Sequence, residues 1–215
     1  MLDVSVVITC YNHEEFIGRC IRSVINQLHI EKKSYEIIVV DDFSSDNSKK
    51  IINDFDDHII KIFNKKNKGL PYSRNLGIKK SLGEYLLFLD SDDYLSNDAI
   101  YIMKKFLDEN KNNYDAVSCD YTTVKKNKTK IRRFSSKEKP IACGILYKKS
   151  KIVSSGMFNT KFKFYEDVEF RNRFLKKNKI GYLEIPLYRY TMHKNNSTKN
   201  KTILKRYHKM LKDLK

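Results

Sequence analysis

The chain has 215 residues, of which 40% are apolar, so it is long enough for one ordinary domain or two small ones with a real core. No apolar run approaches the roughly 20 residues of a membrane span, and the spacing of the four cysteines matches no zinc motif. We therefore expect reduced thiols and a cytoplasmic protein without a leader peptide. The formal charge of +17 suits nucleic acid, an anionic membrane or a phosphorylated ligand, although composition alone favours a solvated, Lys-rich surface.

The first half of the sequence alternates between apolar runs and segments of helical periodicity. Residues 4–8 (VSVVI) form a continuous, mostly β-branched run, which is typical of a strand buried on both faces. The predicted strands are 4–8, 35–42, 58–63 and 83–90, and the predicted helices are 14–27, 44–55, 69–82 and 97–109. Four alternations of strand and helix predict a doubly wound α/β sheet with mostly parallel strands and helices on both faces.

The pattern changes after residue 110. The sequence predicts a strand with a basic hairpin at 114–134, a strand and short helix at 141–153, a helix at 166–178 and a strand pair broken at Pro186. No linker rich in Gly, Ser or Pro separates this α+β part, so we expect one fused domain with a second, smaller lobe. Residues 199–215 predict a basic amphipathic helix, which either packs on the body or lies on an anionic membrane.

Acidic side chains follow the predicted strands at the points where these strands end. Asp42 closes the second strand, and Asp90, Asp92 and Asp93 come at the end of the fourth. Because ligands of open α/β sheets bind beyond the carboxyl ends of the strands, these groups should meet at one rim. Clustered carboxylates repel one another, and they suit Mn²⁺ or Mg²⁺. We therefore expect a divalent cation there, carrying a diphosphate.

Five segments together resemble the family-2 glycosyltransferases: VSVVITCYN, EIIVVDDFSSDNS, NKGLPYSRNLGI, GEYLLFLDSDDYL and FYEDVEF, in the order and rough spacing of that family. The resemblance covers about residues 3–198. It implies a GT-A domain over 1–198, with a nucleotide-sugar-binding half (1–109) and an acceptor-side half (110–198). It also implies inverting transfer from a nucleotide diphosphate donor, most often a UDP-sugar, to a hydroxyl of a glycan or lipid-linked acceptor.

The resemblance also implies roles for single residues. Thr9 and Tyr11 match the loop that meets the nucleotide base, and Asp42 matches the carboxylate that accepts a hydrogen bond from the base. Arg74 matches an arginine near the nucleotide, and Asp90 matches the carboxylate on the ribose side. Ser91 is a further donor-binding residue, and Asp92 matches the metal ligand. Asp93 is expected to support the loop. His193 matches a histidine that can complete the metal site or touch the diphosphate, and Lys194 is a candidate for assisting the leaving phosphate. His13 lies close to the donor loop in sequence.

Asp167 matches the catalytic base of the family, with Glu166 beside it. A physical argument agrees: inverting transfer is one displacement, and the acceptor hydroxyl has a pKa far above 7, so a carboxylate must take its proton. The competing interpretation is a helix N-terminus that carries acids because they favour that end of the dipole.

Several other functions fit the sequence less well. A nucleotidyltransferase of related fold would need a Gly- and Arg-rich loop after the first strand, which TCYNHEEF lacks. A protein that binds nucleic acid or an anionic glycan is suggested by the charge and by the basic hairpin, but no nucleic-acid motif is present, and we expect no nucleic-acid partner. A glycoside hydrolase would not need the metal carboxylates. An inactive scaffold is disfavoured because Asp42, Asp92 and Asp167 are all present. Surface polysaccharide synthesis in a bacterium is suggested only by the Lys, Asn and Ile bias of the chain.

Overall fold

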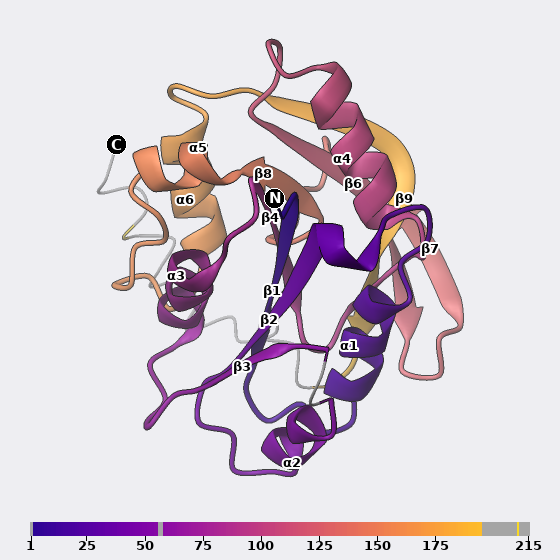
Figure 1. Ribbon diagram of the computed structural model, residues 1–215, viewed down its shortest axis with the longest axis vertical. Helices are drawn as coiled ribbons and strands as arrows, with labels where there is room; N and C mark the ends of the chain where they lie inside the picture. Colours follow the sequence, from indigo (N-terminus) through magenta and orange to yellow (C-terminus); the bar gives the residue numbers. More distant parts are fainter. Residues whose placement is uncertain (1, 56–57, 195–209, 211–215) are drawn as a thin grey trace.

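The structure is a computed structural model, and it describes residues 2–55, 58–194 and 210. Its first half contains four parallel strands and the helices that connect them (Figure 1). The elements are β1 (Val4–Cys10), α1 (Ile17–Ile25), η1 (Lys32–Ser34), β2 (Tyr35–Asp41), α2 (Ser48–Asn53), β3 (Ile60–Phe63), α3 (Leu70–Lys80), β4 (Tyr85–Asp90), β5 (Tyr94–Leu95) and α4 (Ala99–Glu109). All four predicted strands are present, in the order β3-β2-β1-β4. The doubly wound arrangement predicted from the alternation of the sequence is confirmed.

The second half extends the same sheet. Its elements are β6 (Ala116–Lys125), β7 (Lys130–Phe134), β8 (Ile145–Lys148), α5 (Lys149–Ser154), α6 (Glu166–Phe174) and β9 (Ile180–Met192). The sheet order is β3-β2-β1-β4-β8-β6-β9-β5, with β7 paired to β6. The strand β8 is antiparallel to both β4 and β6, so the second half joins the parallel half edge to edge.

The predicted break at Pro186 is wrong, because β9 runs through it from Ile180 to Met192. The register between β6 and β9 shifts around Asp120, which lies opposite Pro186. A bulge of this kind absorbs the proline, which has no N–H to give to a ladder.

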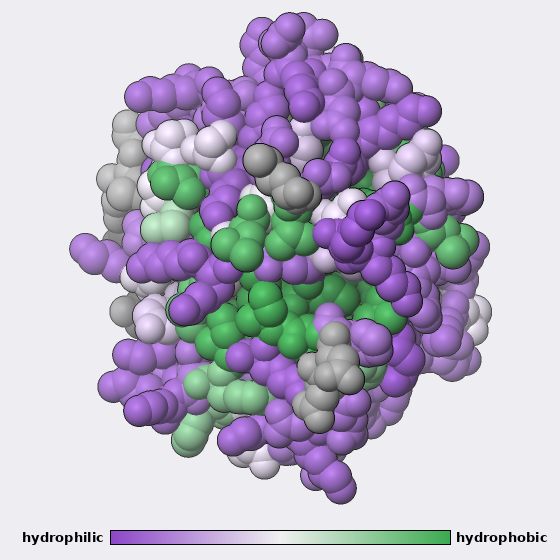
Figure 2. All heavy atoms as spheres, viewed as in Figure 1, coloured by the Kyte–Doolittle hydropathy of each residue, from purple (hydrophilic) through white to green (hydrophobic). Residues whose placement is uncertain are grey.

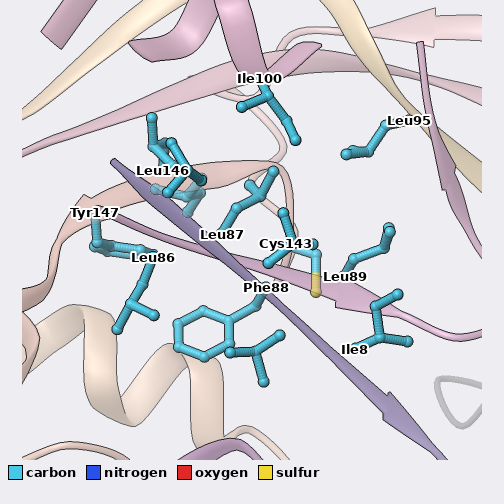
Figure 3. Packing of buried hydrophobic residues seen from close by; sticks show 14 of the residues in the cluster. Ile8, Leu86, Leu87, Phe88, Leu89, Leu95, Ile100, Cys143, Leu146 and Tyr147 are labelled. Atoms are coloured by element: carbon cyan, nitrogen blue, oxygen red, sulfur yellow. The ribbon is translucent and has the colours of Figure 1, made fainter. Parts of the chain in front are cut away.

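Helices cover both faces of the sheet, with α3 and α6 on one side and α1 and α4 on the other (Figure 1). The helix α3 lies very close to the sheet, since a Cβ placed on Gly77 would come within 2.2 Å of Cγ1 of Val7. The central strands carry apolar side chains toward both layers, as Leu86, Leu87 and Phe88 illustrate (Figure 3). This double burial explains why the strands read as continuous apolar runs in the sequence.

The surface is mostly hydrophilic, as expected of a chain in which 32% of the residues are charged. Hydrophilic residues cover most of the face drawn in Figure 2 and surround an apolar area near its centre. The four cysteines are free and buried. Within the described ranges, no helix has both the length and the apolar content needed to cross a membrane. The predicted helix 199–215 lies almost wholly outside the described residues, so the choice between packing on the body and lying on a membrane stays open.

Candidate functional site

The carboxyl ends of β1, β2 and β4 meet at one rim of the sheet. The parallel registers pair Thr9 with Asp90 and Cys10 with Asp41, so the polar residues that follow these strands are brought together. A cavity of about 710 Å³ opens beyond them, which is within the range of small-molecule sites. Of the nine site residues predicted from the sequence, eight line this cavity: Thr9, Tyr11, Asp42, Arg74, Asp90, Ser91, Asp92 and Asp167.

Three residues beside the cavity hold backbone conformations that side chains other than glycine rarely adopt. Asn12 follows β1 with φ 54°, Phe43 follows β2 with φ 69°, and Tyr165 precedes α6 with φ 59°. Strained backbone of this kind gathers at binding and catalytic sites, because the surrounding structure holds it for a purpose other than stability. Asn12 and Phe43 directly follow the predicted site residues Tyr11 and Asp42, and Tyr165 comes two residues before Asp167.

Each acid of the cluster after β4 has its own partner in the protein. Oδ1 of Asp90 accepts a hydrogen bond from Nη2 of Arg74 at 2.9 Å, and Oδ2 of Asp92 lies 2.8 Å from Nε2 of His193. Asp93 is buried, and it accepts hydrogen bonds from the Tyr188 hydroxyl at 2.6 Å and from the Thr191 N–H at 2.7 Å. Burial, reinforced by the neighbouring carboxylates, raises the pKa of Asp93 well above its ordinary value. The protein itself therefore relieves part of the repulsion, and Asp93 supports the loop as expected.

Arg74 is a buried residue that lines the cavity. Its side chain is only 1% exposed, and besides Asp90 it donates from Nη1 to Oε1 of Glu166 at 2.8 Å. Burial is the largest influence on Glu166 and raises its pKa to about 7, although Arg74 opposes this. The same guanidinium thus links the acids after β4 to the first turn of α6.

Asp167 lies next to Glu166 in that first turn and is partly exposed to the cavity. Among the described residues, its carboxylate accepts one hydrogen bond, from Nη2 of Arg171 at 3.3 Å. A partly exposed carboxylate with one long hydrogen bond retains the capacity to accept a proton. This is the property required of a general base.

Asp42 is buried and accepts three hydrogen bonds. Its Oδ1 binds the side-chain amide of Asn64 at 2.7 Å and the Lys68 N–H at 2.9 Å, and its Oδ2 binds the Gly69 N–H at 2.7 Å. The carboxylate therefore fixes the loop that leads into α3. A carboxylate has about four acceptor positions, so about one is left for a ligand. Tyr11 is 47% exposed, and its ring lines the cavity.

Three groups that can ligate a cation gather around Asp92. One nitrogen of His13, one nitrogen of His193 and a carboxylate oxygen of Asp92 all lie within 4.8 Å of one another. The sequence predicted Asp92 and His193, and it marked His13 only as a neighbour of the donor loop. Imidazole and carboxylate ligands together fit a divalent ion.

The comparisons with known proteins show the family and the fold of the chain. Residues 5–181 match the family model "Glycosyl transferase family 2". A poly(ribitol-phosphate) beta-glucosyltransferase of Bacillus spizizenii is 41% identical over 113 residues, which are 51% of this chain and 18% of that protein. The chain thus spans less than a fifth of the length of the first curated relatives that it matches.

Solved structures of two proteins resemble most of the fold. S. aureus TarS 1–349 in complex with UDP has a TM-score of 0.77 at 24% identity, covering 89% of this chain and 61% of that chain; TarS is also solved with UDP-GlcNAc. The Pyrobaculum calidifontis mannosyltransferase PcManGT, in complex with GDP-Man and Mn²⁺, has a TM-score of 0.73 at 16% identity and covers 90% of this chain and 58% of that chain. The fold is the GT-A fold that the sequence predicted. Since the family model covers most of the chain, the protein belongs to glycosyltransferase family 2.

Proposed function

We propose that the protein transfers a sugar from a nucleotide diphosphate donor, a UDP-sugar, to an acceptor hydroxyl with inversion at the anomeric carbon. The observation that carries the proposal is one cavity lined both by Asp92, beside two histidines, and by Asp167. A cation site and a proton acceptor at one cavity are what metal-assisted sugar transfer needs. The TarS complexes with UDP and UDP-GlcNAc support uracil as the base of the donor.

The donor would bind with its base at the end of β1. Tyr11 offers an exposed ring on which the nucleobase can stack, and Thr9 is a buried residue near the end of β1. Asp42 holds the neighbouring loop and retains about one acceptor position for an N–H of the base. The diphosphate then reaches Asp90 and Asp92 after β4.

A divalent cation, Mn²⁺ or Mg²⁺, would be held by Asp92 and His193. When bound, such an ion supplies positive charge to the leaving diphosphate. The Mn²⁺ complex of the related PcManGT supports this part of the proposal. Asp90 is paired with the buried Arg74, whereas Asp92 lies beside two histidines, so Asp92 is the carboxylate of the pair better placed to hold the ion.

Asp167 would serve as the base of the displacement. The acceptor oxygen forms its bond to the anomeric carbon while the bond from that carbon to the phosphate oxygen breaks, and Asp167 takes the hydroxyl proton. The electron pair of the broken bond leaves with the nucleotide diphosphate. Glu166, held by Arg74, fixes the first turn of α6 and so keeps Asp167 in place.

The acceptor is a hydroxyl of a glycan or a lipid-linked sugar. The β6–β7 hairpin carries Lys125, Lys126, Lys128, Lys130, Arg132 and Arg133, and its Lys126 carbonyl accepts a hydrogen bond from Arg19, which also binds the backbone of Asp92. A basic hairpin so close to the cation cluster favours an acceptor that carries phosphate. The poly(ribitol-phosphate) relative supports this choice.

The test is turnover with a panel of UDP-, GDP-, CDP- and TDP-sugars in the presence of Mn²⁺, measured as released nucleotide diphosphate, for the native protein and for Asp167→Asn. We expect release from a UDP-sugar, with turnover lowered about 10²–10⁴-fold in the variant and UDP affinity unchanged. Asp54→Asn, at an exposed position, is the matched control. Near-normal turnover of Asp167→Asn would refute the assigned base, and release only from a GDP-sugar would refute the uridine assignment.

A further inference from the structure

His13 lies in the cation cluster although no metal motif contains it. It comes from the segment between β1 and α1, whereas Asp92 follows β4 and His193 follows β9. One potential ligand atom of each residue lies within 4.8 Å of the other two. Three chain segments, separated by about 80 and 100 residues in sequence, thus bring three groups of metal-ligand chemistry to one point.

His13 is held in place by two hydrogen bonds, one from its backbone and one from its imidazole. Its backbone N–H donates to Oγ of Ser48 at 3.0 Å, and its Nδ1 lies 2.7 Å from Oγ of Ser91, which is buried. When Nδ1 donates its proton to Ser91, Nε2 carries the lone pair that an ion needs. Histidines that ligate metals are oriented in this way by a partner on the other ring nitrogen.

The spacing within the cluster also suits an ion. Nε2 of His193 and Oδ2 of Asp92 are 2.8 Å apart. Neighbouring ligands of an octahedral ion with bonds of about 2.1 Å lie about 3 Å apart, so this pair already has the separation of two adjacent ligands. The rings of His13 and His193 stand at 89° to each other, with centroids 5.9 Å apart, so they approach the centre of the cluster from different directions.

We propose that His13 is the third protein ligand of the divalent cation, and that two imidazoles beside one carboxylate make the site prefer a transition-metal ion to Mg²⁺. Imidazole nitrogen binds Mn²⁺, Co²⁺ and Zn²⁺ better than it binds Mg²⁺, which favours oxygen ligands and water. The inference deepens the proposed function, since it identifies which ion assists the same transfer, and it rests on that function only for the role of the ion.

The direct test is binding of Mn²⁺ to the protein, alone and with UDP, followed by electron paramagnetic resonance. The native protein should show couplings from two imidazole nitrogens, and His13→Ala should show one. The affinity for Mn²⁺ should fall at least about 10-fold in His13→Ala, while the weaker affinity for Mg²⁺ changes less. His58→Ala, at an exposed histidine outside the cluster, is the matched control and should behave as the native protein. Ser91→Ala keeps the imidazole but removes its hydrogen bond, so its loss should be intermediate.

Three results would overturn the inference. The first is unchanged Mn²⁺ affinity in a folded His13→Ala, with or without UDP. The second is absence of nitrogen coupling in the native protein. The third is a loss of UDP affinity in His13→Ala without any loss of Mn²⁺ affinity, since this would make His13 a phosphate contact. The proposed function fails separately: a protein that binds Mn²⁺ through two imidazoles but releases nucleotide from no sugar donor would refute the transfer and leave the metal site standing.

Discussion

Replacing Arg74 by methionine should destabilise the protein strongly, because it removes the counter-charge of two carboxylates. Arg74 is 1% exposed, and the Glu166 side chain that it contacts is 7% exposed, so that carboxylate would be left in the interior without a partner. Breaking a buried pair on one side costs about 3–5 kcal/mol. Asp90 is 30% exposed and can be hydrated from the cavity, so it adds at most about 1 kcal/mol.

Urea denaturation at pH 8, where Glu166 with a pKa of about 7 is ionised, would measure this loss. The double variant Arg74→Met/Glu166→Gln should recover most of it, since no buried charge then lacks a partner. At pH 5, a protonated Glu166 needs no counter-charge, so the loss should be smaller there. Arg132→Met, on the exposed hairpin, is the control. A loss below about 1 kcal/mol at pH 8, or a double variant no more stable than the single one, would refute the reasoning.

Two further predictions concern stability. Gly77→Ala should destabilise the protein by about 1–3 kcal/mol, because the new Cβ would lie 2.2 Å from Cγ1 of Val7. Thermal unfolding measures this loss, and adding Val7→Ala to the same chain should reduce it. Unchanged stability of Gly77→Ala would contradict the prediction, since it would show that α3 can move outward. The raised pKa of Glu166 means that the folded state holds more protons than the unfolded state between the ordinary value of 4.5 and about 7. The free energy of unfolding should therefore fall as pH rises through that window, and Glu166→Gln should flatten this dependence; equal slopes for the two proteins would contradict it.

The strands of the first half could be predicted because each is buried on both faces and so leaves a continuous apolar run in the sequence. The path of β9 could not, since the effect of Pro186 depends on the register shift that β9 makes there against Asp120 of β6. Register shifts arise from the pairing of two strands, and neither strand carries the signal alone.

Most of the candidate site could be predicted because polar residues at the ends of parallel strands must meet at one rim. The partners of those residues could not be predicted. Arg74 and Glu166 are separated by 92 residues in sequence, and their contact depends on how α6 packs against α3. His13 joins the cation cluster through contacts of the same long range. Side-chain contacts between residues so far apart in sequence depend on tertiary packing, which cannot be predicted from one sequence.

The central claim is that the cavity binds a nucleotide diphosphate through a divalent cation held by Asp92. The measurement that tests it most directly is calorimetric titration of UDP into the native protein and Asp92→Asn, each with Mn²⁺ and with a chelator. We predict that the native protein binds UDP at least about 10-fold more tightly with Mn²⁺ than with the chelator, and that Asp92→Asn loses this difference. Equal UDP affinity of the two proteins in Mn²⁺, or native affinity that is the same with the chelator, would contradict the account.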